Sequence, residues 1–251
     1  MVIRNPRTIS LFLLSLPALL GTAHGVEFST VEISGKRVTV CRVDVKKERL
    51  QLFHRDENGQ PFKRFDPLVR WLGERGQTLT FAMNAGMYHR DYTAVGVSVA
   101  DGKELSPLNT AIGVGNFFLK PNGVFLVSDR GARVVETSEY PRLKERLLLA
   151  TQSGPLLLRN GRMHAAFKEG SENRLFRNGV GVPSPEVALF AISEVPVNFH
   201  EFATMFRDVL HCPDALFLDG TVSSLHAPKL KRSDFRIDLG PFIGATEQAA
   251  K

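Results

Sequence analysis

Several signatures of well-known protein activities are missing from this chain of 251 residues. It has no glycine-rich phosphate loop that ends in Lys-Ser/Thr, no dinucleotide-binding fingerprint and no nucleophile elbow around a serine. Its seven histidines show none of the paired spacings that hold zinc. These absences argue against nucleotide-dependent, zinc-dependent and serine-elbow enzymes, and nothing in the sequence requires a redox cofactor.

Cysteine is scarce, and its two copies are Cys41 and Cys212. If the chain is exported, an oxidising compartment would allow them to form a disulfide. Both cysteines stand beside apolar residues, so two buried free thiols are equally consistent with the sequence. The choice depends on the distance between their Cα atoms, which the sequence does not contain.

Positive charge is present but is not clustered. The formal net charge is +6, and the lysines and arginines are scattered between acidic residues. Proteins that bind nucleic acid usually carry a clustered basic face, so we expect no nucleic-acid partner. A modest positive balance favours solubility, and it could also attract a phosphorylated or anionic envelope polymer. The apolar fraction of 43% supplies enough side chains for a sizeable core.

The one long apolar run is at the N-terminus. Two arginines precede an apolar stretch at residues 9–20, and small residues follow at the usual cleavage spacing. This layout predicts a signal peptide over residues 1–25, and its removal lowers the net charge from +6 to +4, because it contains two basic residues and no acids. An uncleaved anchor is the alternative, but Pro17 and Gly21 would interrupt its helix. We therefore expect an exported protein, periplasmic or extracellular, with no stable membrane span after cleavage.

Short apolar runs separated by turn residues dominate the remaining chain. Turn signals at 101–102, 121–123 and 160–161 predict three hairpins, and hairpins require antiparallel pairing because parallel strands need long crossovers. The hairpins are predicted at 95–102, 114–128 and 156–164, and further strands at 37–45, 49–54, 79–83, 187–193 and 215–218.

Three helices are predicted among these strands. One begins at Asp66-Pro67, a second at Pro141, and a third at Asn198, where Glu201 completes a capping-box pattern. Few helices with many strands predict an α+β fold of mixed, largely antiparallel sheets with a few packed helices. We find no repeat or linker, so residues 26–251 are expected to form one domain.

Polar residues gather where several apolar runs end. Segments 84–88 and 151–155 are turns of small residues beside strands, and each would be an ordinary turn or bulge if taken alone. A third cluster runs from Arg174 to Gly181, with Arg177 near its centre; arginine can bind a phosphate through two parallel hydrogen bonds, although many arginines are merely exposed. Glu194 follows a buried run, where partial burial would raise its pKa toward that of a general acid or base. A solvated loop glutamate is an equal alternative.

The sharpest local signal is the segment 215–224. Its apolar run places Asp219 at the C-terminal tip of a strand, Gly220 permits a sharp turn, and Thr221, Ser223 and Ser224 supply hydroxyls. The structural alternative is an aspartate that caps the following turn.

Taken in order, these segments resemble the phosphodiester glycosidase family, which has the uncovering-enzyme-like domain, and in particular its exported bacterial members. One departure is that Thr221 and Val222 stand where the uncovering enzyme is glycine-rich, and their side chains would narrow the pocket. The segments that carry the resemblance are 84–88, 110–113, 153–155, 177–179 and 218–224.

The resemblance implies hydrolysis of the bond between a sugar C1 and a phosphodiester oxygen, in a phosphorylated glycan or a small sugar phosphodiester. In that reaction Asp219 would stabilise or attack the cationic sugar, Glu194 would activate water, and Arg177 would stabilise the departing phosphate. The substrate-binding residues implied are Asn84, Ser153, Gly154, Arg177, Asn178, Gly220, Ser223 and Ser224.

Three other interpretations stay open on sequence grounds. The protein could bind an envelope glycan or teichoic-type polymer without catalysis. It could be a serine esterase that uses Ser153 or Ser223, with His226 as the histidine nearest in sequence. No cofactor is certain, but Asp219 with nearby carbonyls could hold a divalent cation such as calcium.

Overall fold

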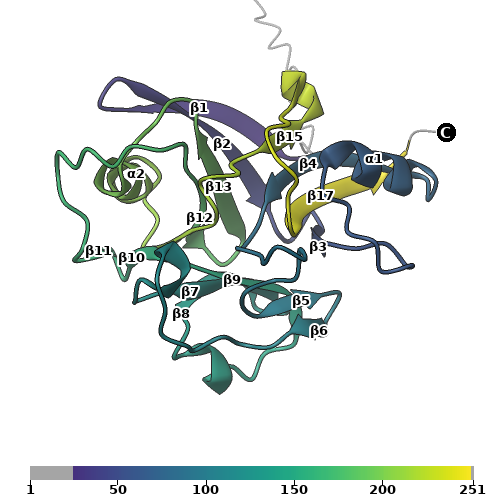
Figure 1. The fold of residues 1–251 in the computed structure, drawn as a ribbon. Coiled ribbons are helices and arrows are strands. Elements are labelled where there is room, and N and C mark those ends of the chain that lie inside the picture. Colours follow the sequence, from purple (N-terminus) through teal and green to yellow (C-terminus); the bar gives the residue numbers. More distant parts are fainter. Residues whose placement is uncertain (1–24, 250–251) are drawn as a thin grey trace, which may run out of the picture.

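The computed structural model describes residues 25–249, which form three sheets (Figure 1). Apart from Gly25, the predicted signal peptide lies outside the described residues. The strand pairs within all three sheets are antiparallel. In order across the seven-stranded sheet, the strands are β1 (Glu27–Ile33), β2 (Lys36–Asp44), β13 (Val187–Ser193), β12 (Asn178–Ser184), β14 (Asp214–Phe217), β10 (Leu156–Arg159) and β11 (Arg162–Met163).

The other two sheets have five strands each, and two helices accompany them. This arrangement confirms the predicted α+β class. One five-stranded sheet contains β16 (Arg232–Ser233), β15 (Leu225–Ala227), β4 (Gln77–Asn84), β17 (Phe242–Gln248) and β3 (Leu50–Phe53). The other contains β6 (Lys103–Ser106), β5 (Ser98–Ala100), β9 (Leu147–Ser153), β7 (Gly123–Ser128) and β8 (Gly131–Glu136). The helices are α1 (Phe65–Gly73) and α2 (Phe199–Thr204), and α2 continues into a π-helical turn at Met205–Val209.

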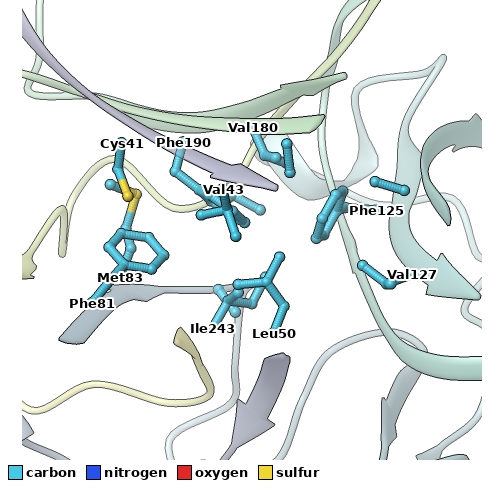
Figure 2. Close-up of a cluster of buried hydrophobic side chains, with 14 of the residues drawn as sticks. Cys41, Val43, Leu50, Phe81, Met83, Phe125, Val127, Val180, Phe190 and Ile243 are labelled. Carbon is cyan, nitrogen blue, oxygen red and sulfur yellow. The ribbon is translucent and has the colours of Figure 1, made fainter. Parts of the chain in front are cut away.

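The main hydrophobic core lies between the three sheets. Figure 2 shows side chains from all three converging on one cluster. The ring of Phe190 on β13 contacts that of Phe81 on β4 and that of Phe125 on β7, with centroid distances of 5.1 and 5.5 Å. Because each of these rings comes from a different sheet, burial of their apolar surface holds the three sheets together.

The two helices cover the outer faces of two sheets (Figure 1). Phe202 and Phe206 of the α2 segment are buried against the seven-stranded sheet in a cluster with Leu157 and Phe217. Helix α1 packs in a separate cluster with residues of β4 and β17.

The predicted start of α2 is confirmed, whereas that of α1 is one residue too late. Asn198 caps α2 as expected, since its side chain accepts a hydrogen bond from the Glu201 backbone N–H at 2.8 Å and the Glu201 carboxylate accepts one from the Asn198 N–H at 3.1 Å. Helix α1 begins one residue before the predicted cap, at Phe65, so Asp66 lies in its first turn. The extended backbone of Arg64 occupies the capping position and provides no side-chain cap.

The helix predicted from Pro141 is wrong. Residues Tyr140–Arg142 form a single 3-10 turn, and Leu147 begins β9. Leu143 and Leu147 have helical spacing, but Leu147 belongs to a continuous apolar run that pairs with β7. Pairing with a neighbouring strand therefore overrides the local helical pattern.

The hairpin predicted at 114–128 is also wrong. Residues Asn116–Phe118 form a 3-10 turn, and the Asn122 side chain donates a hydrogen bond to the Phe117 carbonyl at 2.8 Å. Strand β7 turns instead at residues 129–130 and pairs with β8. The hairpins at 101–102 and 160–161 are confirmed as β5–β6 and β10–β11, and the five single strands are confirmed as β2, β3, β4, β13 and β14.

Cys41 and Cys212 are both free and buried, so the free-thiol alternative is the one observed. Cys41 belongs to the core between the sheets, whereas Cys212 packs in the cluster beneath α2. Within residues 25–249, no helix has both the length and the apolar character that crossing a bilayer requires.

Candidate active site around Asp219

Strand ends from all three sheets meet at one place. Asn84 ends β4, Asn178 begins β12, Ser153 ends β9, and Asp219 follows β14 by two residues. Asn84, Ser153 and Asn178 are almost completely buried, with exposed fractions of 2%, 0% and 0%. Buried polar side chains need hydrogen-bond partners, and these residues find them in one another and in the turn after Asp219.

Two asparagine side chains fix the main chain of Asp219. The Asn178 Nδ2 donates to both the carbonyl and the Oδ1 of Asn84, each at 3.0 Å. The Asn84 Nδ2 then donates to the Asp219 carbonyl at 3.0 Å, and the Asn178 Oδ1 accepts from the Asp219 N–H at 3.1 Å. Both peptide groups of the aspartate are thus held before any ligand binds, which is the condition for a preorganised site.

The serines hold the same turn. Ser153 Oγ donates to the Leu218 carbonyl at 2.5 Å, and Ser223 Oγ donates to the Gly220 carbonyl at 2.9 Å. The Ser224 N–H donates to Asn84 Oδ1 at 2.9 Å. His226 forms no hydrogen bond with Ser153 or Ser223, whose hydroxyls are bound to the turn around Asp219, and its Nδ1 pairs with Ser233 Oγ at 3.0 Å. The arrangement favours a positioning role for these hydroxyls over the serine-esterase interpretation.

Asp219 is partly buried, and burial raises the pKa of its carboxyl to about 6. A hydrogen bond from the Thr221 backbone N–H opposes this shift and is the smaller effect. The pKa of Tyr88 is raised to about 12, mainly by burial and, to a smaller extent, by the negative charge of Asp219. A carboxyl group that titrates near neutral pH at the meeting point of three sheets is a candidate catalytic group.

The two predicted glycines are required by close packing. A Cβ on Gly220 would lie 2.7 Å from the Phe176 carbonyl oxygen and 2.9 Å from the Phe217 ring. A Cβ on Gly154 would lie 2.6 Å from the Asn122 Cβ. Both glycines therefore let segments approach one another beneath the site, in the way that a residue without a side chain allows.

Glu194 lies outside this hydrogen-bonded web. Its carboxylate accepts a hydrogen bond from Thr39 Oγ1 at 2.6 Å and pairs with Arg232 at 2.5 Å. Arg232 in turn donates to Asp234 at 2.8 Å. The structure places Glu194 in a network that ties β13 to the segment after β16.

Arg177 is not brought to Asp219 by its side chain, which corrects the expectation that its guanidinium faces the phosphate. Arg177 directly precedes β12, and neighbouring side chains of an extended chain point to opposite sides, so Asn178 reaches Asn84 while Arg177 points toward α2. The Arg177 side chain is 1% exposed, lies 3.6 Å from the Phe199 ring centre, and donates from Nε to the Val197 carbonyl at 2.9 Å. Burial lowers the pKa of this arginine to about 10.

Thr151 and Gln152 were not singled out from the sequence, although they support the site. Thr151 Oγ1 accepts a hydrogen bond from the Gly86 N–H at 3.1 Å. Gln152 Oε1 accepts from the N–H groups of Val97 and Asn109, at 3.0 and 2.9 Å. The sequence signal was their place in the 151–155 segment. In the structure, Thr151, Gln152 and Ser153 each bind the main chain of a different loop.

Two further features bear on what the site could bind. One cleft, with a volume of about 1100 Å³, is lined by residues of β3 and of segments 89–95 and 105–111, and Asp219 is not part of this lining. Among residues 25–249, no group of three or more His, Cys, Asp or Glu side chains is arranged to hold a metal ion. A cation at Asp219 would therefore depend on main-chain carbonyls, and this site stays a prediction.

Comparison with known proteins identifies the family. Residues 77–232, which include all the residues of the web around Asp219, match the phosphodiester glycosidase family. The chain belongs to this family. The resemblance predicted from the sequence is thus confirmed, and the family's general activity is the hydrolysis of phosphodiester-linked sugars.

Both a sequence relative and structural neighbours are similar to this phosphodiester glycosidase family member. The uncharacterized protein YigE of Escherichia coli strain K12 is 30% identical over 226 residues, which are 90% of this chain and 87% of YigE. The zebrafish N-acetylglucosamine-1-phosphodiester alpha-N-acetylglucosaminidase catalytic domain has a TM-score of 0.59 at 12% identity, over 90% of this chain and 83% of that one. A hypothetical protein from Synechocystis has a TM-score of 0.53 at 15% identity, over 88% and 61% of the two chains. The two structural neighbours show a common fold.

Proposed function

We propose that this protein hydrolyses the bond between a sugar C1 and a phosphodiester oxygen, in an envelope or extracellular glycan or in a small sugar phosphodiester. The observation that carries the proposal is Asp219, whose main chain is fixed by Asn84 and Asn178 and whose carboxyl has a pKa of about 6. A fixed carboxylate that is ionised at neutral pH can stabilise the positive charge that develops on the sugar ring.

This reaction has little need of a general acid to protonate the leaving group. When the C1–O bond breaks, its electron pair leaves with a phosphate monoester, which is already a good leaving group. Water then supplies a hydroxyl to C1, and its proton ends on the released phosphate or in solvent. Asp219 would stabilise the cationic sugar throughout, and the general-base role predicted for Glu194 would concern the water alone.

The experiment uses residues 26–251 and a panel of sugar 1-phosphates esterified to p-nitrophenol. Cleavage at C1 releases free sugar and p-nitrophenyl phosphate, and hydrolysis in ¹⁸O-water puts the label on the sugar. Asp219→Asn should lower kcat/KM by about 10²-fold or more, whereas Asp129→Asn, in an exposed turn between β7 and β8, should not. Full turnover by Asp219→Asn, or release of p-nitrophenol instead of free sugar, would contradict the proposal.

A non-catalytic binder of envelope glycan is the second candidate. It is favoured by the ion pair between Glu194 and Arg232 and by the burial of Arg177, which leave Asp219 without two of its predicted partners. Saturable binding of a sugar phosphodiester by the wild-type protein, with no release of sugar over a long incubation, would support binding over hydrolysis.

Export completes the proposal, because an envelope glycan lies outside the cytoplasm. The supporting observation is the basic start followed by an apolar run and small residues within residues 1–25. Mass spectrometry of the purified protein should find a chain that begins at Val26, in the periplasmic or extracellular fraction. An intact N-terminus in the membrane fraction would support the uncleaved anchor instead.

A further inference from the structure

The segment from Asp234 to Leu239, here called the 234–239 loop, contacts Tyr88, whose pKa is affected by the charge of Asp219. Tyr88, which senses the charge of Asp219, donates a hydrogen bond from its hydroxyl to the Asp238 carbonyl at 2.6 Å. Just after the loop, a Cβ on Gly240 would lie 2.4 Å from the Tyr88 ring. The loop and the aspartate therefore flank the same tyrosine.

Ion pairs and hydrogen bonds hold this loop at both ends. At its start, Asp234 pairs with Arg232 at 2.8 Å, and Arg232 is also bound by Glu194. At its end, the Asp238 carboxylate accepts from Arg64 at 2.9 Å, and the Leu239 N–H donates to the Lys63 carbonyl at 2.7 Å. A loop fixed in this way loses little conformational entropy when a ligand binds to it.

The centre of the loop faces solvent. Phe235 and Ile237 are 59% and 51% exposed, and Arg236 between them is exposed as well. The Arg236 guanidinium stacks on the Phe176 ring, 4.0 Å from its centre. The carbonyl of the same Phe176 packs against Gly220, the residue that follows Asp219. Arg236 is thus one side chain away from the turn that carries the catalytic candidate.

The other arginines of this region are paired or buried. Arg174, Arg232 and Arg64 are paired with carboxylates, and Arg177 is buried against Phe199, with its Nη1 left without a hydrogen-bond partner. Within residues 25–249, Arg236 takes part in no ion pair. Stacking covers one face of its guanidinium and leaves the in-plane N–H groups free, which is the geometry that binds two phosphate oxygens at once.

We propose that Arg236 binds the phosphate of the substrate at the Asp219 site, in the role that the sequence had given to Arg177. The inference rests on the proposed function for the identity of the substrate, but the phosphate-binding site itself can be tested without turnover.

The test measures binding of phenyl phosphate, which carries the phosphate monoester without a sugar, by titration calorimetry at pH 7 and low salt. The wild-type protein should bind it saturably, Arg236→Ala should bind about tenfold more weakly or worse, and Arg236→Lys should fall between them because it keeps the charge without the fork. The control is Arg162→Ala, which removes an exposed arginine from the β10–β11 hairpin. Equal binding by Arg236→Ala and wild type, or no saturable binding by wild type, would overturn the inference.

The two proposals fail separately. If phenyl phosphate binding depends on Arg236 but no sugar is released by any variant, hydrolysis fails and the phosphate site stands. If turnover depends on Asp219 while Arg236→Ala keeps wild-type kcat/KM and binding, the role of Arg236 fails alone. Melting temperatures of both Arg236 variants should lie close to that of wild type, because the exposed guanidinium donates to no buried group and makes only the stacking contact with Phe176.

Discussion

At the scale of single residues, Asp219 should set the pH dependence of the reaction. Its pKa is raised to about 6 by burial, so the ionised form that stabilises a cationic sugar is complete above that pH and is lost below it. We expect kcat/KM to fall about tenfold for each pH unit below 6. A profile measured from pH 4 to pH 8 should show this acidic limb in wild type, and its presence in Asp219→Asn would assign it to another group.

The same raised pKa has a consequence for stability. Because the pKa in the folded protein lies above the ordinary value of 3.8, the folded state is favoured at low pH and loses that advantage as pH rises through about 6. Asp219→Asn removes the cost of the buried charge, so we expect it to raise the free energy of unfolding at pH 8 by about 2–3 kcal/mol. Urea unfolding at pH 8 and pH 4 checks this, and an equal effect at both values would contradict the electrostatic explanation.

Which site residues gather could be predicted from the sequence, whereas the direction of one could not. Asn84, Ser153, Asn178 and the turn after Asp219 come together as the ordered segments predicted. Arg177 was misjudged because β12 was not recognised: glycines at 179 and 181 and a proline at 183 weaken its strand pattern. Without the strand, the alternation that turns Arg177 away from Asn84 was invisible.

At the scale of secondary-structure elements, α2 depends on its cap. Asn198 accepts from the Glu201 N–H and donates to the Ser171 carbonyl at 3.0 Å, and its side chain is fully buried. We expect Asn198→Ala to lower the free energy of unfolding by about 1–2 kcal/mol, because it leaves a helix N–H without a partner. Chemical denaturation measures the loss. Asn198→Ser should be less damaging, since its hydroxyl can still accept from the Glu201 N–H.

The segment after β16 should depend on Glu194. Its ion pair with Arg232 favours an anchoring role, so Glu194→Gln should lower kcat/KM by less than about tenfold and leave the acidic limb near pH 6 in place. A general base would instead cost about 10²–10⁴-fold. The pH profile of Glu194→Gln, compared with that of Arg232→Gln, decides between the two roles, because an anchor gives similar defects from either side of the pair.

Elements with strong local signals were predictable and those fixed by distant partners were not. Strand β13 alternates little but is apolar up to its last residue, Ser193, and its bounds were predicted at 187–193 as observed. Strand β1 was missed because its side chains are mostly exposed or half-buried, which leaves no apolar pattern to detect. Strand β15 has only three residues, too few for a local pattern. It is held by pairing with β16, which is near in sequence, and with β4, which is far away.

At the scale of the whole molecule, the site depends on all three sheets at once. Asn178, Asp219 and Ser224 reach Asn84 across 94, 135 and 140 residues of chain. We therefore expect loss of activity and loss of β-sheet circular dichroism to follow the same curve in urea. Activity that disappears first, at a lower urea concentration, would show that the site opens before the sheets separate.

The ends of the three sheets meet at a point that no short stretch of the chain can reproduce, because its residues run from Asn84 to Ser224. A proteolytic fragment that ended inside this span, however well it retained its own strands, would lack at least one wall of the site. Turnover would consequently report on complete folding of the chain. Cutting the chain at the exposed 160–161 turn would leave two inactive halves, which recover activity only by reassociating.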